Sequence, residues 1–170
     1  MKSVTSDAPS SGFASEASEA VQGLIGAVVG RVGVSRSHGL VLDFGRPIRR
    51  ADEGSRQRGE QRLTTHNADW RLDLGSGTLV GSGDDVDFAQ ASGKELVGSV
   101  VFQIGVDLRS LEASIAFGAS TLRIFPSCYK PSGWRNDDAQ DPLPYWRLWL
   151  PSGETIAVGP GMVDSRGGPW

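Results

Sequence analysis

An internal repeat limits the folds open to this chain more than any other feature of its sequence. Residues 24–34 (LIGAVVGRVGV) align with residues 96–106 (LVGSVVFQIGV) at an offset of 72. Residues 70–77 (WRLDLGSG) align with residues 146–153 (WRLWLPSG) at an offset of 76. Two matches in the same order indicate a duplicated unit, over roughly residues 22–88 and 94–162.

The pattern within each unit is that of β-strands. Apolar residues alternate with polar or small ones, as expected of a strand with one buried face. Turn residues at 35–39, 75–77, 118–120 and 151–154 separate the apolar runs. The residues expected on the buried face of the leading strand are Val28, Val32 and Val34 in the first copy, and Val100, Phe102, Ile104 and Val106 in the second.

These patterns predict a mainly β protein with little helix. We expect two tandem repeats of about four to five antiparallel strands each, packed as a sandwich or split barrel, because each apolar face needs a cover. Residues 1–20 contain few large apolar side chains and are predicted to be a disordered tail. Residues 21–88 then form the first β repeat and residues 89–170 the second, as one compact body.

The composition excludes several classes of protein. One cysteine among 170 residues excludes an intramolecular disulfide and a cysteine-based zinc site. No apolar run approaches the roughly 18 residues of a membrane span, and the N-terminal segment lacks the apolar core of a secretory signal. We therefore expect a cytoplasmic protein without a membrane partner. The formal charge of −3 does not favour nucleic acid as a partner.

The sequence contains no recognisable catalytic constellation. The motifs of serine hydrolases, P-loop enzymes, zinc peptidases and dinucleotide-binding proteins are absent. We expect no catalytic residue, no cofactor and no metal, and we interpret the acidic run at residues 81–87 as a linker between the units. The alternative is a small-ligand site or enzyme with a pocket between the repeats, in which His66, Asp69 and Arg71 form the polar lining. A polar turn leading into a strand is the simpler interpretation of these three residues.

The two copies differ most in their middle segments, where function is expected. Residues 46–62 of the first copy contain six arginines, which favours either an anion-binding arm or a solvated insertion. Residues 127–144 of the second copy are acidic and proline-rich, and either meet a partner or cap the sheet. On the adjoining strand, aromatic residues and arginine alternate on the face opposite the core, which is typical of interfaces unless the sheet is covered on both sides. The predicted binding residues are Trp134, Asp137, Asp138, Asp141, Tyr145, Arg147 and Trp149.

The two-copy pattern resembles a family of small bacterial proteins that are similar to immunity proteins of polymorphic toxin systems. The shared features are a leading L-[IV]-G-x-x-[VI] strand, an F-G hairpin, the W-R-L strands and the final run from Trp146 to Gly161, which ends V-G-P-G. The resemblance covers about residues 22–162, and the arginine-rich segment after Gly45 departs from it. It implies a non-enzymatic protein-binding module that neutralises a cognate toxin. We expect a protein partner, such as a toxin domain, and a monomer or small homo-oligomer.

Overall fold

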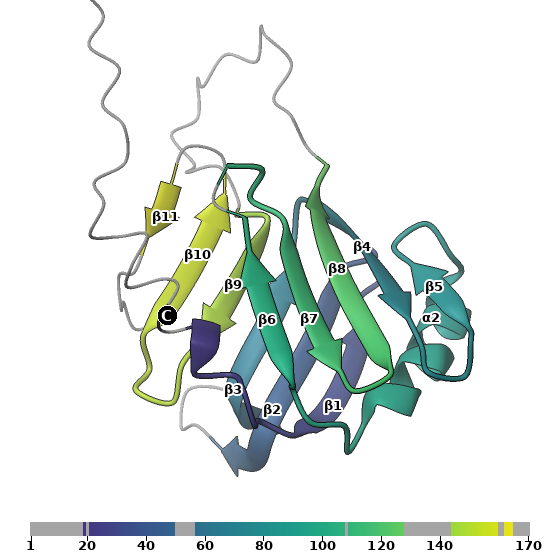
Figure 1. Ribbon diagram of the computed structural model, residues 1–170, viewed down its shortest axis with the longest axis horizontal. Helices are drawn as coiled ribbons and strands as arrows, with labels where there is room; N and C mark the ends of the chain where they lie inside the picture. The colour runs from purple at the N-terminus through teal and green to yellow at the C-terminus, as the bar shows by residue number, and fades with distance from the viewer. Residues whose placement is uncertain are drawn as a thin grey trace, which may run out of the picture.

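In the computed structural model, the chain folds into two antiparallel β-sheets, and the prediction of a mainly β sandwich is confirmed (Figure 1). The structure describes residues 19, 21–49, 57–107, 109–127, 144–159 and 162–164. Within these residues the elements are β1 (Val29–Val34), β2 (Leu40–Arg49), β3 (Gln57–Thr65), β4 (Ala68–Asp73), β5 (Leu79–Gly81), α2 (Val86–Gly93), the 3-10 helix η1 (Lys94–Leu96), β6 (Gln103–Val106), β7 (Ala113–Phe117), β8 (Ser120–Pro126), β9 (Trp146–Trp149), β10 (Thr155–Gly159) and β11 (Met162–Asp164).

Each sheet contains strands from both copies of the repeat. The first sheet has the order β1-β2-β3-β9-β10-β11, and the second has the order β5-β4-β8-β7-β6. The W-R-L hairpin of each copy, β4-β5 or β9-β10, thus pairs with the three leading strands of the other copy. The first exchange occurs between Thr65, which ends β3, and Ala68, which begins β4 in the opposite sheet. The two copies consequently share one interior.

Apolar side chains fill the space between the two sheets. Trp70 of β4 and Trp146 of β9 occupy equivalent positions in the repeat, and each is only 2% exposed. The hairpins that follow them close in the same way: in each, the last residue of the turn is a glycine that donates its N–H to the carbonyl of the leucine three residues earlier, Gly77 to Leu74 and Gly153 to Leu150. The sequence match between the W-R-L segments therefore corresponds to a match in structure.

A local twofold relation joins the two copies at the start of each unit. Val28 and Val100, which are 72 residues apart, form an isolated antiparallel bridge. Four backbone N–H to carbonyl bonds flank it in two equivalent pairs: Gly26 to Val101 (2.9 Å) with Gly98 to Val29 (2.8 Å), and Val101 to Ala27 (2.9 Å) with Val29 to Ser99 (2.9 Å). A rotation that exchanges the copies exchanges the members of each pair. We call the axis of this rotation the pseudo-dyad.

The residues with positive φ follow the same relation. All of them within the described part of the chain fall into equivalent pairs: Gly26 with Gly98, His38 with Leu111, Gly45 with Gly118, and Gly77 with Gly153. His38 and Leu111 both have φ 62°, although neither is a glycine. The duplicated scaffold thus retains the left-handed turn at this position even where the residue type is unfavourable.

The expected alternation in the leading strands holds from Val32 and Ile104 onwards, but it is wrong for the residues before them in both copies. Val29 and Val101 are buried, followed by two exposed residues and then by buried Val32 and Ile104. The pairing of β1 with β2 shifts register between Val29 and Arg31, as at a β-bulge. An extra residue in the strand reverses the direction of the side chains before it, so Val28, Val100 and Phe102 are exposed rather than buried.

A glutamine amide covers the outer edge of each leading strand. Gln90 of α2 accepts from the N–H of Val34 (2.8 Å) and donates to the carbonyl of Val32 (3.0 Å) in β1. Gln22, in the N-terminal helical turn, donates to the carbonyl of Ile104 in β6 (3.3 Å), the residue equivalent to Val32. Protected edges of this kind disfavour strand addition by other chains.

Two segments differ from their predicted structure. The acidic run at residues 81–87, predicted to link the units, ends β5 and begins α2, where Asp85 accepts from the N–H groups of Asp87 and Phe88 and caps the helix. Much of the arginine-rich segment is strand, because β2 continues to Arg49 and β3 begins at Gln57, while residues 50–56 lie outside the described part of the chain. Of the predicted tail at residues 1–20, the structure describes only Glu19, which lies in the N-terminal helical turn.

Candidate functional site

An apolar patch surrounds the pseudo-dyad on the surface of the molecule. Ile25 and its equivalent Val97 are each 48% exposed, and Val28 and its equivalent Val100 are 43% and 48% exposed. Phe102 adjoins them and is 72% exposed, more than any other large apolar residue of the described chain. We call these five residues the dyad patch. Clustered apolar exposure of this kind is typical of a surface that another molecule covers.

The exposure of Phe102 has a structural cause. It lies between buried Val101 and buried Ile104, at the position where the first copy has Gly30 next to the register shift. A Cβ on Gly30 would lie 3.2 Å from the carbonyl oxygen of Gly45, so this site in the first copy favours glycine. The second copy instead presents a phenyl ring to solvent. Irregularities of this type redirect side chains and are common next to functional sites.

A hollow of about 540 Å³ lies within the dyad patch. The first copy contributes Ile25 and Gly26 to its lining, and the second contributes Val100, Phe102 and Phe117 among others. The lining contains no charged residue. The hollow can therefore accept an apolar side chain of another molecule without desolvating a charge.

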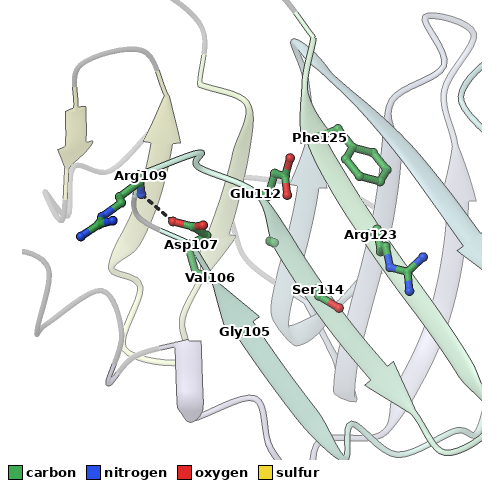
Figure 2. A pocket seen from close by; sticks show the side chains of 9 residues that line it. Gly105, Val106, Asp107, Arg109, Glu112, Ser114, Arg123 and Phe125 are labelled. Atoms are coloured by element: carbon green, nitrogen blue, oxygen red, sulfur yellow. Dashed lines mark hydrogen bonds between the residues drawn. The ribbon is translucent and has the colours of Figure 1, made fainter.

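A second hollow, of about 730 Å³, lies on the outer face of the second sheet where β6 ends and β7 begins (Figure 2). Gly105 and Ser114, which are cross-strand partners, lie at its base. Glu112, Arg123 and Phe125 project around it from β8 and from the start of β7. Its lining is thus mixed in charge, in contrast to the hollow of the dyad patch.

The outer face of the first sheet carries a row of charged residues. Arg62 donates to Asp43 through Nε (2.6 Å) and Nη2 (3.2 Å), and Asp43 is buried with a side chain 3% exposed. Arg31 approaches the same carboxylate at 3.8 Å. Arg62 is also the cross-strand partner of Trp149. Arg62, which was predicted to lie in a mobile or anion-binding loop, therefore neutralises a buried carboxylate within a strand.

The structure places three of the seven predicted binding residues. Arg147 and Trp149 of β9 are half-buried on this outer face, as the alternation predicts. Tyr145 is only 5% exposed and packs in the core, so its predicted place in an exposed aromatic row is wrong. The cause is its position before β9, where its N–H donates to Val158 (2.7 Å). Trp134, Asp137, Asp138 and Asp141 lie outside the described residues.

The three residues of the alternative pocket have separate neighbours. His66 shares a hydrogen bond with the hydroxyl of Thr64 (3.1 Å), and burial together with the charge of Arg147 lowers its pKa below the ordinary value. Asp69 accepts from Ser82 (3.0 Å), and Arg71 pairs with Asp73 (3.2 Å). The structure does not show these residues lining one pocket between the repeats.

Two further observations concern the described residues alone. They contain no group of three or more histidine, cysteine, aspartate or glutamate side chains that could together hold a metal ion. Among their helices, none combines the length and apolar character that crossing a bilayer requires.

Comparison with known proteins gives no relative. No protein-family model matches the chain, and neither a curated protein nor a solved structure shows significant similarity to it. The sequence analysis expected Phe102 in the core and so missed the dyad patch. The signal that could have found it was the mismatch between Gly30 and Phe102 within an otherwise conserved stretch of the repeat.

Proposed function

We propose that this chain is a non-enzymatic protein-binding module whose partner docks on the dyad patch. The observation that carries the proposal is the exposure of five apolar side chains around the pseudo-dyad, with Phe102 at 72%. Protein interfaces concentrate binding energy in a few aromatic and apolar anchors inside a rim that excludes water. An exposed phenyl ring beside an uncharged hollow supplies both an anchor and a site for an anchor of the partner.

The shape of the duplicated fold supports the same proposal. The patch lies where both copies meet, and paired backbone hydrogen bonds join residues 26–29 of the first copy to residues 98–101 of the second. A surface that is ordered before binding loses less conformational entropy when the complex forms. Gln90 and Gln22 cover the outer edges of β1 and β6, so a partner cannot easily add a strand there. At these two edges we expect recognition through side chains.

The partner that we propose is a toxin domain, which the chain neutralises in the cytoplasm as an immunity protein. The support for this step is the resemblance of the repeat to immunity proteins, together with a formal charge of −3 that suits a basic partner. Neutralisation requires that the bound chain block the toxin's active site or hold the toxin inactive.

Co-expression with the product of the adjacent gene tests the proposal, which predicts that this product is a toxin. We expect a stoichiometric complex on size-exclusion chromatography and protection of the host cell from the toxin. Hydrogen exchange in the complex should slow for the backbone around the dyad patch, residues 25–28 and 97–102, relative to the free chain. Exchange around β5, which carries the exposed Leu79 (57%), serves as the internal control.

Two results would overturn the proposal. A complex in which residues 25–28 and 97–102 exchange as fast as in the free chain would remove the dyad patch as the binding surface. Failure to form any complex with the neighbouring protein, together with no protection of the host, would remove the immunity role.

A further inference from the structure

The hollow on the outer face of the second sheet pairs a carboxylate with an aromatic ring. Ala113 and Ile124 are cross-strand partners, so the preceding Glu112 and the following Phe125 lie opposite each other on β7 and β8. Both line the hollow, and Figure 2 shows both side chains projecting from this face of the sheet. A carboxylate next to a ring face is the arrangement that recognises guanidinium and ammonium groups.

The two arginines near the hollow leave its centre open to a cation. Arg123 donates to Asp73 (3.4 Å), on the side away from Glu112. The guanidinium of Arg109 points away from the hollow, beyond Asp107 (Figure 2). The carboxylate of Glu112 has no hydrogen-bond or ion-pair partner among the described residues. Its charge is therefore available to a ligand.

The turn that carries Glu112 is held in a strained and hydrogen-bonded conformation. Leu111 has φ 62°. Its N–H donates to the carbonyl of Asp107, and the N–H of Asp107 donates to the carbonyl of Glu112 (2.9 Å). The carboxylate of Asp107 accepts from the N–H groups of Arg109 and Ser110, and these bonds lower its pKa. Asp107 therefore remains ionised and adds a second negative charge at the rim.

The equivalent place in the first copy lacks both recognition groups. The matching strand registers place Gly39 where the second copy has Glu112, and His66 where it has Phe125. Gly39 has no side chain to offer, and His66 lies next to the positive charge of Arg147, which disfavours a second cation there. A feature that differs between duplicated copies on one scaffold indicates function rather than scaffold.

We propose that this hollow binds a basic side chain, arginine or lysine, of the protein partner. The inference rests on the proposed function and names the chemistry that the partner presents. The charged group lies between the Glu112 carboxylate and the Phe125 ring, and its aliphatic stem lies over Gly105, where an added Cβ would meet no atom within 4 Å. Val106 of this hollow lies four positions after Phe102 of the dyad patch, about 14 Å along an extended chain. One partner can reach both.

Titration of the full chain with Nα-acetyl-arginine amide, followed by NMR, tests the hollow without the partner. We expect saturable shifts of the Gly105 and Ser114 amides, and much weaker shifts with the neutral isostere Nα-acetyl-citrulline amide. Glu112→Gln should weaken binding about two- to fivefold, as expected for one exposed ion pair combined with a ring contact. Glu154→Gln, an equal charge change in the exposed turn of the other sheet, should leave binding unchanged.

Gly105→Val provides a second variant that leaves Glu112 in place. The new side chain fills the base of the hollow and suits a strand, so we expect loss of arginine binding with an unchanged unfolding transition. Gly33→Val, at the equivalent position of the first sheet, is the matched control and should bind normally. Two results would overturn this site. One is equal chemical-shift changes from the arginine ligand and the citrulline ligand. The other is shift changes that Glu112→Gln and Gly105→Val both leave unaltered. That outcome would leave the dyad patch standing, because its own test is the hydrogen exchange of the complex.

Discussion

The two equivalent core tryptophans differ in a single hydrogen bond, and this difference predicts unequal effects of the same substitution. Nε1 of Trp70 donates to the carbonyl of His38 at 2.7 Å. Nε1 of Trp146 is buried and has no acceptor among the described residues. Both side chains are 2% exposed, so replacing either by phenylalanine removes about the same packing from the core.

The expected difference follows from the cost of each polar group. Trp70→Phe loses a hydrogen bond worth roughly 1 kcal/mol and leaves the His38 carbonyl without this donor. Trp146→Phe removes a buried N–H whose burial without a partner costs roughly 1–3 kcal/mol, which offsets part of its packing loss. We therefore expect Trp70→Phe to reduce the free energy of unfolding by about 2–4 kcal/mol more than Trp146→Phe does, the sum of these two effects.

Urea denaturation followed by far-ultraviolet circular dichroism measures this difference. With a denaturant slope of roughly 1–3 kcal/mol per molar urea, the two midpoints should differ by about 1 M or more. Equal midpoints, or a lower midpoint for Trp146→Phe, would refute the reasoning that hydrogen bonding distinguishes the two tryptophans.

Two further predictions concern backbone packing and pH. Gly59→Ala should destabilise the fold by about 3 kcal/mol or more, because the added Cβ would clash with the carbonyl oxygen of Phe44. Thermal unfolding measures the loss, and an unchanged Tm would contradict this prediction. His66 should titrate below its ordinary pKa of 6.5, because burial and Arg147 disfavour its charged form. Below pH 6.5 His66 therefore binds more protons in the unfolded chain than in the folded one. Its contribution to the free energy of unfolding is complete above pH 6.5 and is lost as the pH falls through the pKa of the folded chain. His66→Gln should flatten this dependence in denaturation measured across that range, and an unaltered slope would contradict it.

The strands and turns were predictable because their signals are local. Alternation in segments such as residues 113–117 reports which face is buried, and Gly77 and Gly153 mark turns that need positive φ. The exchange of hairpins between the copies was not predictable in this way. Alternation identifies a buried face but not the neighbouring strand, and only two residues separate Thr65 in one sheet from Ala68 in the other.

The sites were harder to predict than the fold. A single irregularity near Gly30 and Phe102 reverses the side chains before it, and periodicity alone cannot reveal such a shift. The arginine content of residues 46–62 suggested a loop, although Arg62 pairs with Asp43 across the consecutive strands β2 and β3. Glu112 and Phe125 come together only through the β7-β8 register, so their pairing was not visible from spacing.

The affinity of the Phe102→Ala variant for the partner protein recovered by co-expression tests the central claim most directly. Isothermal titration calorimetry should show a loss of roughly 30-fold or more, which corresponds to about 2 kcal/mol for an interface anchor. Phe88→Ala, which removes an exposed ring from α2 (48% exposed), should bind within about twofold of the unaltered chain. Equal affinity of the two variants, with both still folded, would contradict the assignment of the dyad patch as the binding surface.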